Sequence, residues 1–210
     1  MTRYLLTAAF VVSAMLSPLA HADGQGAFVQ AGAGRATQSH NGTAWGVDGG
    51  YRWTVANGVY LGAETGYHDL ASSKFRYGDS ESFSDMSGTH QFASQGTGRV
   101  GTQAALLGAN LRWDMSDQLY AVVHGGLARY RTRTRTDGTS TIDAQSPSTF
   151  HNAYNVFDTR WYAGVGFGFD FTPQISLQFT YDHYPQHYSA YGYHYSNNLD
   201  IYGTAVEFRF

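Results

Sequence analysis

Residues 161–181 read WYAGVGFGFDFTPQISLQFTY, and their alternating pattern decides the fold class. Trp161, Val165 and Phe169 belong to a row of apolar residues at every second position, while mostly glycine fills the positions between them. A period of two indicates a β-strand, because successive side chains of a strand point to opposite faces. The pattern resumes after the Thr-Pro-Gln sequence of residues 172–174, which predicts a second strand joined by a tight turn.

The same alternation, with weaker patterning in places, predicts eight strands in all, and their connections alternate in length. Short turns are expected at residues 54–58, 114–118 and 172–174, whereas the connections at 35–43, 71–98, 134–157 and 185–198 are longer and polar. This asymmetry predicts an all-β fold, an eight-stranded antiparallel transmembrane β-barrel with short periplasmic turns and long extracellular loops. The predicted strands are residues 27–34, 45–53, 59–68, 100–113, 119–133, 160–171, 175–182 and 199–210.

Composition and charge exclude several classes of function. The chain has 25 Gly, 16 Tyr and 13 Phe but is only 14% charged, which disfavours a helical bundle. Its net charge of −3 leaves no basic excess for nucleic acid, so no nucleic-acid partner is expected. The absence of cysteine excludes disulfides, thiolate zinc sites and cysteine catalysis, and no cofactor is expected.

Residues 1–22 have the composition of a secretory signal peptide. Arg3 is their only charged residue, an apolar run follows, and Ala20-His21-Ala22 forms a small-x-small cleavage site. The alternative, a membrane anchor, needs about 20 apolar residues, more than this run contains. We expect cleavage after Ala22, which leaves residues 23–210 as a barrel domain exported to the outer membrane of a Gram-negative cell.

The two faces of the predicted strands have different roles. Aromatic residues near both strand ends are expected to form the two interfacial girdles: Trp53, Trp113 and Phe171 beside the short turns, and Trp45, Tyr67 and Trp161 towards the long loops. The opposite face carries both signs of charge, and the lumen of an eight-stranded barrel is only wide enough for side chains. We therefore expect a paired charge network inside the barrel. Its members are Asp48, Arg52, Glu64, Arg112, Asp170, Glu207 and Arg209, together with Asn110, Gln178 and Asp182.

The last strand ends in alternating, mostly apolar residues up to Phe208 and Phe210. This ending resembles the C-terminal signature of Gram-negative outer-membrane barrels, which implies that both residues are an assembly signal read by the barrel-assembly machinery. Together with residues 27–32 (AFVQAG), 176–184 and 198–203, it makes residues 26–210 similar to the OmpA-like transmembrane barrels, in the plan of the OmpX and Ail group. The resemblance implies architecture better than activity. Peptidoglycan anchoring is not carried over, because we expect no periplasmic domain after Phe210.

Three functions are compatible with this architecture. The first is a non-enzymatic surface protein whose loops contact lipopolysaccharide, other outer-membrane lipids, or a host or cell-surface ligand, with roles in envelope integrity or adhesion. The second is a narrow pore for small solutes or ions. The third is a lipid A-modifying enzyme, because His194, Ser196 and Asn197 match the His-x-Ser-Asn run of the lipid A deacylases. In those enzymes a later Glu orients the His. Glu207 lies about ten residues after Ser196 along an extended strand, at roughly 3.3 Å per residue, which is too far for a triad. No catalytic residue is therefore assigned.

Histidines and arginines supply the remaining candidates. The spacing of three histidines, His183, His187 and His194, places them on a flexible loop that offers no carboxylate to fix their rings. No metal site is therefore assigned to them. Alternate arginines, in contrast, fall on the face that includes Leu119, Val123 and Leu127, which we expect to face lipid. Guanidinium groups bind phosphate bidentately, so this face is predicted to contact lipopolysaccharide phosphates. A solvated strand extension is the alternative. The arginines are Arg129, Arg131, Arg133 and Arg135.

Overall fold

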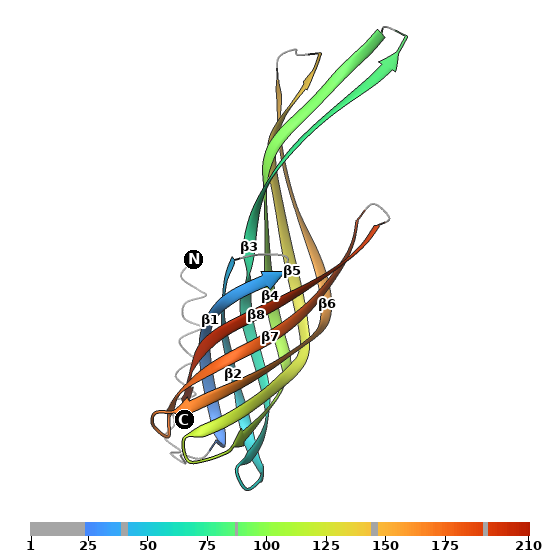
Figure 1. Cartoon of the computed structure of the whole chain (residues 1–210). Coiled ribbons are helices and arrows are strands. Elements are labelled where there is room, and N and C mark those ends of the chain that lie inside the picture. The colour runs from blue at the N-terminus through green and yellow to red at the C-terminus, as the bar shows by residue number, and fades with distance from the viewer. Residues whose placement is uncertain (1–23, 39–41, 87, 144–146, 191–192) are drawn as a thin grey trace, which may run out of the picture.

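The computed structural model describes residues 24–38, 42–86, 88–143, 147–190 and 193–210. In this part of the chain eight antiparallel strands close into a barrel in sequence order (Figure 1), which confirms the predicted fold class. None of the described residues forms a helix long and apolar enough to cross a membrane. The expected signal peptide lies outside the described residues. The strands are β1 (Gly26–Gln38), β2 (Gly42–Ala56), β3 (Val59–Asp85), β4 (Gly88–Asp114), β5 (Leu119–Ile142), β6 (Ser148–Asp170), β7 (Ile175–Ala190) and β8 (Tyr193–Arg209).

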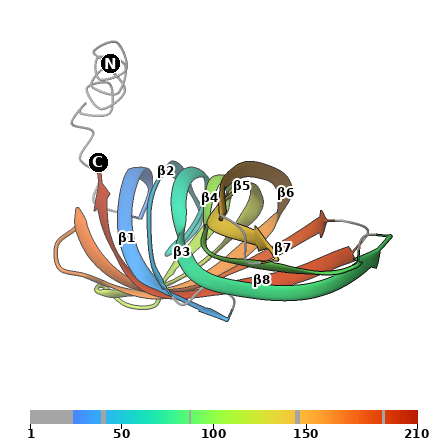
Figure 2. The same cartoon turned by 90° about the horizontal axis from the view of Figure 1, so that it is seen from above.

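The barrel closes through β1 and β8. Phe28 of β1 lies opposite Gly50 of β2 on one side and opposite Arg209 of β8 on the other. The backbone N–H of Phe210 donates to the carbonyl of Ala27 at 3.0 Å, which extends the ladder to the end of the chain. Seen from above, the strands curve round to meet (Figure 2). Closure pairs the backbone groups that an open sheet would leave free at its edges, and this is required inside a membrane.

The connections at the end of the barrel near Phe210 are the predicted tight turns. Asn57-Gly58 joins β2 to β3, and Gly58 has the positive φ of 69° that this two-residue hairpin turn requires. The other two turns share a different design. Ser116 and Thr172 each accept hydrogen bonds through the side-chain hydroxyl from the backbone N–H groups two and three residues ahead.

The connections at the opposite end are long, as predicted, but consist mostly of paired strands rather than irregular loops. β3 and β4 stay in register from Ser72 opposite Gly101 to Asp85 opposite Gly88. β5 and β6 remain paired up to Ser140 opposite Ser148. The Thr, Tyr and Phe residues of these segments favour strands, and hairpin pairing satisfies the backbone. The predicted strands were therefore too short at this side of the barrel, where β1, β3, β5 and β7 end later and β2, β4, β6 and β8 begin earlier than predicted.

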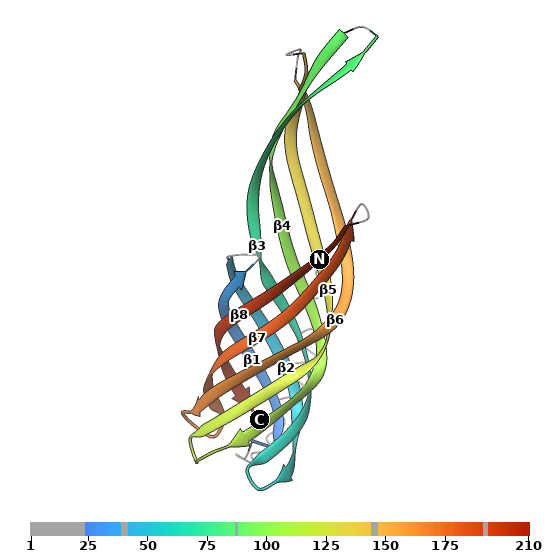
Figure 3. The ribbon, with the colours of Figure 1, turned by 45° about the vertical axis from the view of Figure 1, so that its right-hand side comes forward.

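The extensions of β3 to β6 form what we call the protruding sheet, residues 72–85, 88–101, 133–142 and 148–155. It rises well above the rest of the barrel (Figure 1), and the turned view shows the same four strands standing clear of the other strands (Figure 3). The register of β3 with β2 ends at Asp69, and that of β6 with β7 begins at Ala163. A bulge between Asp69 and Ser72, with Ala71 at a φ of 86°, marks the base of the sheet on β3.

The outside of the barrel is apolar and charged side chains are buried inside it, which is unlike a soluble protein. Leu107 of β4 and Leu127 of β5 lie opposite each other and are both more than half exposed. The six aromatic residues predicted for the two girdles are likewise exposed on the outer surface: Trp45, Trp53, Tyr67, Trp113, Trp161 and Phe171. An outward apolar band with aromatic residues at both margins is typical of a barrel embedded in lipid.

Candidate functional site

Five charged side chains form the periplasmic layer of the lumen, near the short turns: Arg52, Arg112, Asp170, Glu207 and Arg209. Arg52 donates two hydrogen bonds to the carboxylate of Glu207, at 2.9 and 2.7 Å, and both side chains are almost fully buried. Arg112 and Arg209 each donate to Asp170 at 2.6 Å. The structure thus brings together five of the eight charged lumen residues named from the sequence. Every charge in this layer has an opposite charge beside it.

Aromatic rings and an amide complete the periplasmic layer. The guanidinium of Arg52 lies 3.9 Å from the ring centroid of Phe28, and that of Arg112 lies 3.6 Å from the centroid of Tyr120. Asn110 accepts a hydrogen bond from Arg52 at 2.7 Å. Cation–π contacts of this kind stabilise desolvated guanidinium groups. The layer therefore fills its cross-section of the lumen.

A second polar layer lies above the periplasmic one and is centred on His124 of β5. Its Nδ1 lies 3.1 Å from Glu64 of β3, and its Nε2 lies 2.7 Å from Asp182 of β7. The hydroxyl of Tyr162 donates to the same Glu64 oxygen at 2.7 Å. The sequence interpretation named the two carboxylates but not His124. Strand parity could have found it, because His124 is one residue from the outward-facing Val123 and therefore lies on the lumen face of β5.

His68 of β3 forms the other half of this second layer. Its Nε2 lies 2.8 Å from Asp48 of β2, and its Nδ1 lies 3.0 Å from the hydroxyl of Tyr184. A cavity of about 40 Å³ borders Asp48, His68, His124 and Asp182. A cavity of this size has room for a few water molecules, and these four side chains supply polar groups on its otherwise mostly apolar wall. Within the described ranges, no group of three or more His, Asp or Glu residues is placed to hold a metal ion.

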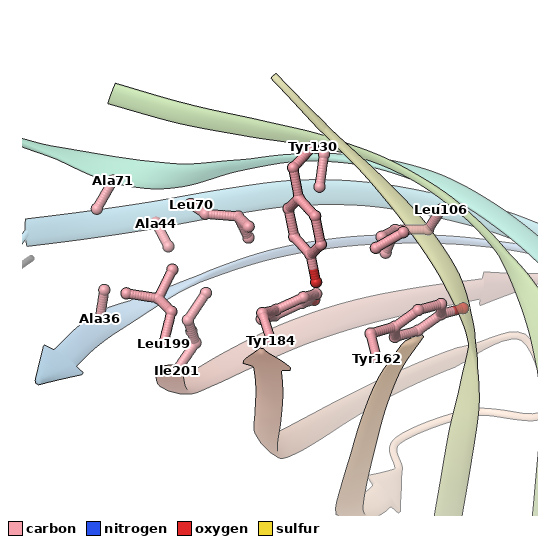
Figure 4. Packing of buried hydrophobic residues seen from close by; sticks show 12 residues of the cluster. Ala36, Ala44, Leu70, Ala71, Leu106, Tyr130, Tyr162, Tyr184, Leu199 and Ile201 are labelled. Carbon is pink, nitrogen blue, oxygen red and sulfur yellow. The ribbon is translucent and has the colours of Figure 1, made fainter. Parts of the chain in front are cut away.

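The extracellular end of the lumen is closed by apolar side chains. Tyr162 and Tyr184 stack with their ring centroids 6.1 Å apart, and Tyr130 points towards Tyr184 from β5 (Figure 4). Leucine, isoleucine and alanine residues from the other strands surround them. We call this set the apolar plug: Ala36, Ala44, Leu70, Ala71, Ala104, Leu106, Ala128, Tyr130, Tyr162, Tyr184, Leu199 and Ile201. Water and ions therefore meet buried apolar surface above the two polar layers.

The four predicted arginines of β5 are all exposed on the outer face, in line with Leu127. Arg135 lies opposite Arg99 of β4, and Arg99 lies opposite Lys74 of β3, so three cations form one row across the sheet. The sequence interpretation missed Lys74 because it placed that residue in a loop, where strand parity does not apply. A hollow of about 500 Å³ on this face is lined by Thr43, Trp45, Asp69, Ser72, Arg99, Gly101, Gln103, Arg131, Arg133 and Arg135.

The remaining candidates are not brought into a catalytic or metal site. Ser196 of the His-x-Ser-Asn run pairs in register with His187, near the extracellular end of β8. Glu207 lies towards the other end of that strand, in the bidentate pair with Arg52. The side chains of His187, His194 and Ser196 lie outside the described part of the structure. His183 is placed 2.6 Å from Asp200, so it does have a carboxylate partner.

Comparison with known proteins gives the following similarities. No curated protein matches the chain. Among solved structures, the attachment invasion locus protein Ail of Yersinia pestis is 10% identical, with a TM-score of 0.48, over 90% of this chain and 99% of that one. Neisserial surface protein A is 15% identical, with a TM-score of 0.40, over 88% and 97%. The outer membrane enzyme PagL is 13% identical, with a TM-score of 0.38, over 87% and 99%. These similarities carry no argument about function.

The match to a protein family is more extensive. The outer membrane protein beta-barrel domain matches residues 6–210, which include all eight strands. The closed antiparallel ring and the apolar outer band are what such a domain requires. The chain therefore belongs to the family of outer membrane protein beta-barrel domains.

Proposed function

We propose that this protein is a non-enzymatic surface barrel of the Gram-negative outer membrane that contacts lipopolysaccharide phosphates through its outward arginines. The observation that carries the proposal is the position of these cations directly above the apolar band. Leu127 lies opposite Trp161, and the next residues of the same face are Arg129, Arg131, Arg133 and Arg135. A face that changes from leucine to arginine where it leaves the hydrocarbon layer meets the phosphate groups of the outer leaflet.

The row formed by Lys74, Arg99 and Arg135 supports an anionic ligand. Like charges directly opposite each other on neighbouring strands are destabilising. In the described part of the chain, no carboxylate forms an ion pair with any of these three side chains. Bound phosphate would offset their repulsion. A single exposed ion pair contributes only about 0 to 1 kcal/mol, so several contacts must act together.

A pore is the second candidate, and the lumen argues against it. The ion pairs of the periplasmic layer and the rings of the apolar plug occupy the space that a channel would need. A lipid A-modifying enzyme is the third candidate. Its nucleophile and base would be Ser196 and His194, but Glu207 is buried in another ion pair and cannot orient that histidine.

Export and assembly complete the proposal. Residues 1–22 direct secretion, and Phe208 and Phe210 form the signal for the barrel-assembly machinery. The rings of these two phenylalanines lie edge to face, with centroids 4.9 Å apart, at the end of β8. The protruding sheet is the part of the molecule best placed for a host or cell-surface ligand, because it stands furthest from the membrane (Figure 3).

The test compares lipopolysaccharide binding before and after removal of the arginine charges. Replacing Arg129, Arg131, Arg133 and Arg135 by Gln is expected to lower affinity for lipopolysaccharide at least tenfold and to leave the heat-dependent shift on detergent gels intact. Arg160→Gln is the control and should bind as the parent does, because Arg160 lies on β6 in the row of the buried Ala128 and pairs with Asp158. Dephosphorylated lipopolysaccharide should bind the parent weakly. Equal binding of both lipid forms by parent and variant would refute the proposal.

A further inference from the structure

The inner face of the protruding sheet, which continues the lumen side of the strands, has an aromatic floor. The ring of Phe75 lies over Gly98, and that of Tyr77 lies over Gly96 and reaches Gly138. Phe150, on the far strand β6, also lies over Gly138. Each ring occupies the place that a Cβ at the glycine would need, so the rings pack flat on the backbone of the two central strands.

Further exposed apolar side chains lie on the same face as this floor. Phe75 is 39% exposed, and Tyr154 and Val156 of β6 are 56% and 37% exposed. Tyr154 belongs to the same cross-strand row as Thr134, Val100 and Ser73, two residues from the row of Phe75. Exposed apolar side chains gathered on one face are a feature of interaction sites in proteins. Here it lies on a sheet that stands outside the membrane.

Acidic residues adjoin the aromatic floor towards the tip of the sheet. Asp79 and Glu81 follow Tyr77 at every second position of β3, so they share its face, and both are exposed. Within the described residues, neither forms an ion pair. The lysine and arginine residues of the protruding sheet lie on the opposite, outer face: Lys74, Arg76, Arg99, Arg133 and Arg135. The outer face also carries Asp137, which pairs with His151, but its net charge is positive. The two faces of one sheet therefore differ in the sign of their net charge.

We propose that the inner face of the protruding sheet is a docking surface for an extended basic peptide segment of another protein. Lysine or arginine side chains of the segment pair with Asp79 and Glu81, and its remaining side chains pack on Phe75 and Tyr154. From the row of Tyr154 to that of Glu81 is eight residues along β3, or roughly 27 Å, the length of an extended peptide of about eight residues. Cations also bind over the faces of aromatic rings, which extends the complementarity to the floor itself.

The charges distinguish this partner from a carbohydrate. A neutral glycan stacked on the rings would gain nothing from the two carboxylates, and an anionic glycan would be repelled by them. A basic segment is attracted to the inner face and repelled by the outer face. Lipopolysaccharide phosphate has the opposite preference, so the two ligands use different faces and do not compete for the same residues.

The test uses the full-length mature protein in nanodiscs of zwitterionic phosphatidylcholine, which carry no net lipid charge. The probe is a fluorescein-labelled nonapeptide with Tyr at positions 1 and 3, Lys at positions 7 and 9 and Ser elsewhere, so that in an extended chain all four side chains face the sheet. The control peptide has Glu in place of Lys. Fluorescence polarisation should show binding of the Lys peptide that weakens with salt, and no binding of the Glu peptide or of either peptide to empty nanodiscs. Asp79→Asn with Glu81→Gln should weaken binding at least tenfold, as should Phe75→Ala with Tyr154→Ala.

Arg133→Gln with Arg135→Gln, on the outer face, is the matched control and should bind the Lys peptide at least as tightly as the parent. Equal affinity of the parent and the acid-free variant would overturn the proposal. Equal binding of the Lys and Glu peptides would overturn it as well. So would displacement of the Lys peptide by a neutral oligosaccharide that occurs equally in the parent and in the Asp79→Asn, Glu81→Gln variant. None of these results bears on the arginine face, so this inference and the proposed lipopolysaccharide contact fail independently.

Discussion

Arg52 and Glu207, which are 155 positions apart in the chain, form a bidentate ion pair that joins β2 to β8 across the lumen. Glu207 is fully buried and also lies 3.6 Å from Arg112 and 3.7 Å from Arg209. One carboxylate therefore balances much of the positive charge of three guanidinium groups. This makes it the residue whose loss most disturbs the periplasmic layer.

Glu207→Gln is expected to lower the free energy of unfolding by about 3 to 5 kcal/mol, because it leaves buried guanidinium groups uncompensated. Urea titrations in detergent micelles, followed by tryptophan fluorescence, measure the change. Arg52→Leu combined with Glu207→Leu should be less destabilising than Glu207→Gln, since both charges leave together. The exposed Glu81→Gln is the control. A Glu207→Gln variant as stable as that control would show that the ion pair contributes little.

Gly168→Ala should destabilise the barrel by roughly 1 to 3 kcal/mol through overpacking. Ring atoms of Tyr120 occupy the place where the new Cβ would stand, so the ring that Arg112 lies against must move. Gly78→Ala is the matched control, because the nearest atom to its Cβ lies 4.0 Å away. The same urea titration compares the two variants. Equal stability would mean that Tyr120 moves aside without cost.

The purified protein is expected to show no large, stable open level in planar lipid bilayers. The periplasmic layer and the apolar plug block the lumen at two heights, and the attraction between buried charges is little screened by salt. Tyr162→Ala with Tyr184→Ala removes the stacked rings of the plug and should still give no open level, because the ion pairs of the periplasmic layer remain in place. A large open level from the unaltered monomer would contradict the sealed lumen and favour the pore hypothesis.

Replacing residues 76–97 by an Asn-Gly turn should leave the barrel folded. Phe75 and Gly98 are direct partners in the ladder, so a two-residue turn can join them. The ladders that close the barrel lie below Asp69 and do not depend on this part of the protruding sheet. Unheated and boiled samples should still migrate differently on a detergent gel. Identical migration would show that the barrel needs the protruding sheet in order to close.

Local pattern was sufficient to predict the architecture. The period of two in β6 and β7, the Asn57-Gly58 turn and the position of Trp53 and Trp161 at opposite strand ends depend only on neighbouring residues. Parity also placed Arg129 to Arg135 in line with Leu127, because it holds along an uninterrupted strand. It was not applied to Lys74, because that residue follows a bulge and was assigned to a loop.

Only the tertiary structure decided which charges meet. The sequence assigns Arg52 and Glu207 to the lumen, but their pairing depends on the register in which β1 closes on β8, a property of the whole ring. The same holds for His124, which contacts carboxylates from β3 and β7 at once. The aromatic floor on Gly98 likewise needs the register of β3 with β4. Strand identity is local and is encoded by alternation, whereas cross-strand partners are set by closure, which no single segment of the sequence encodes.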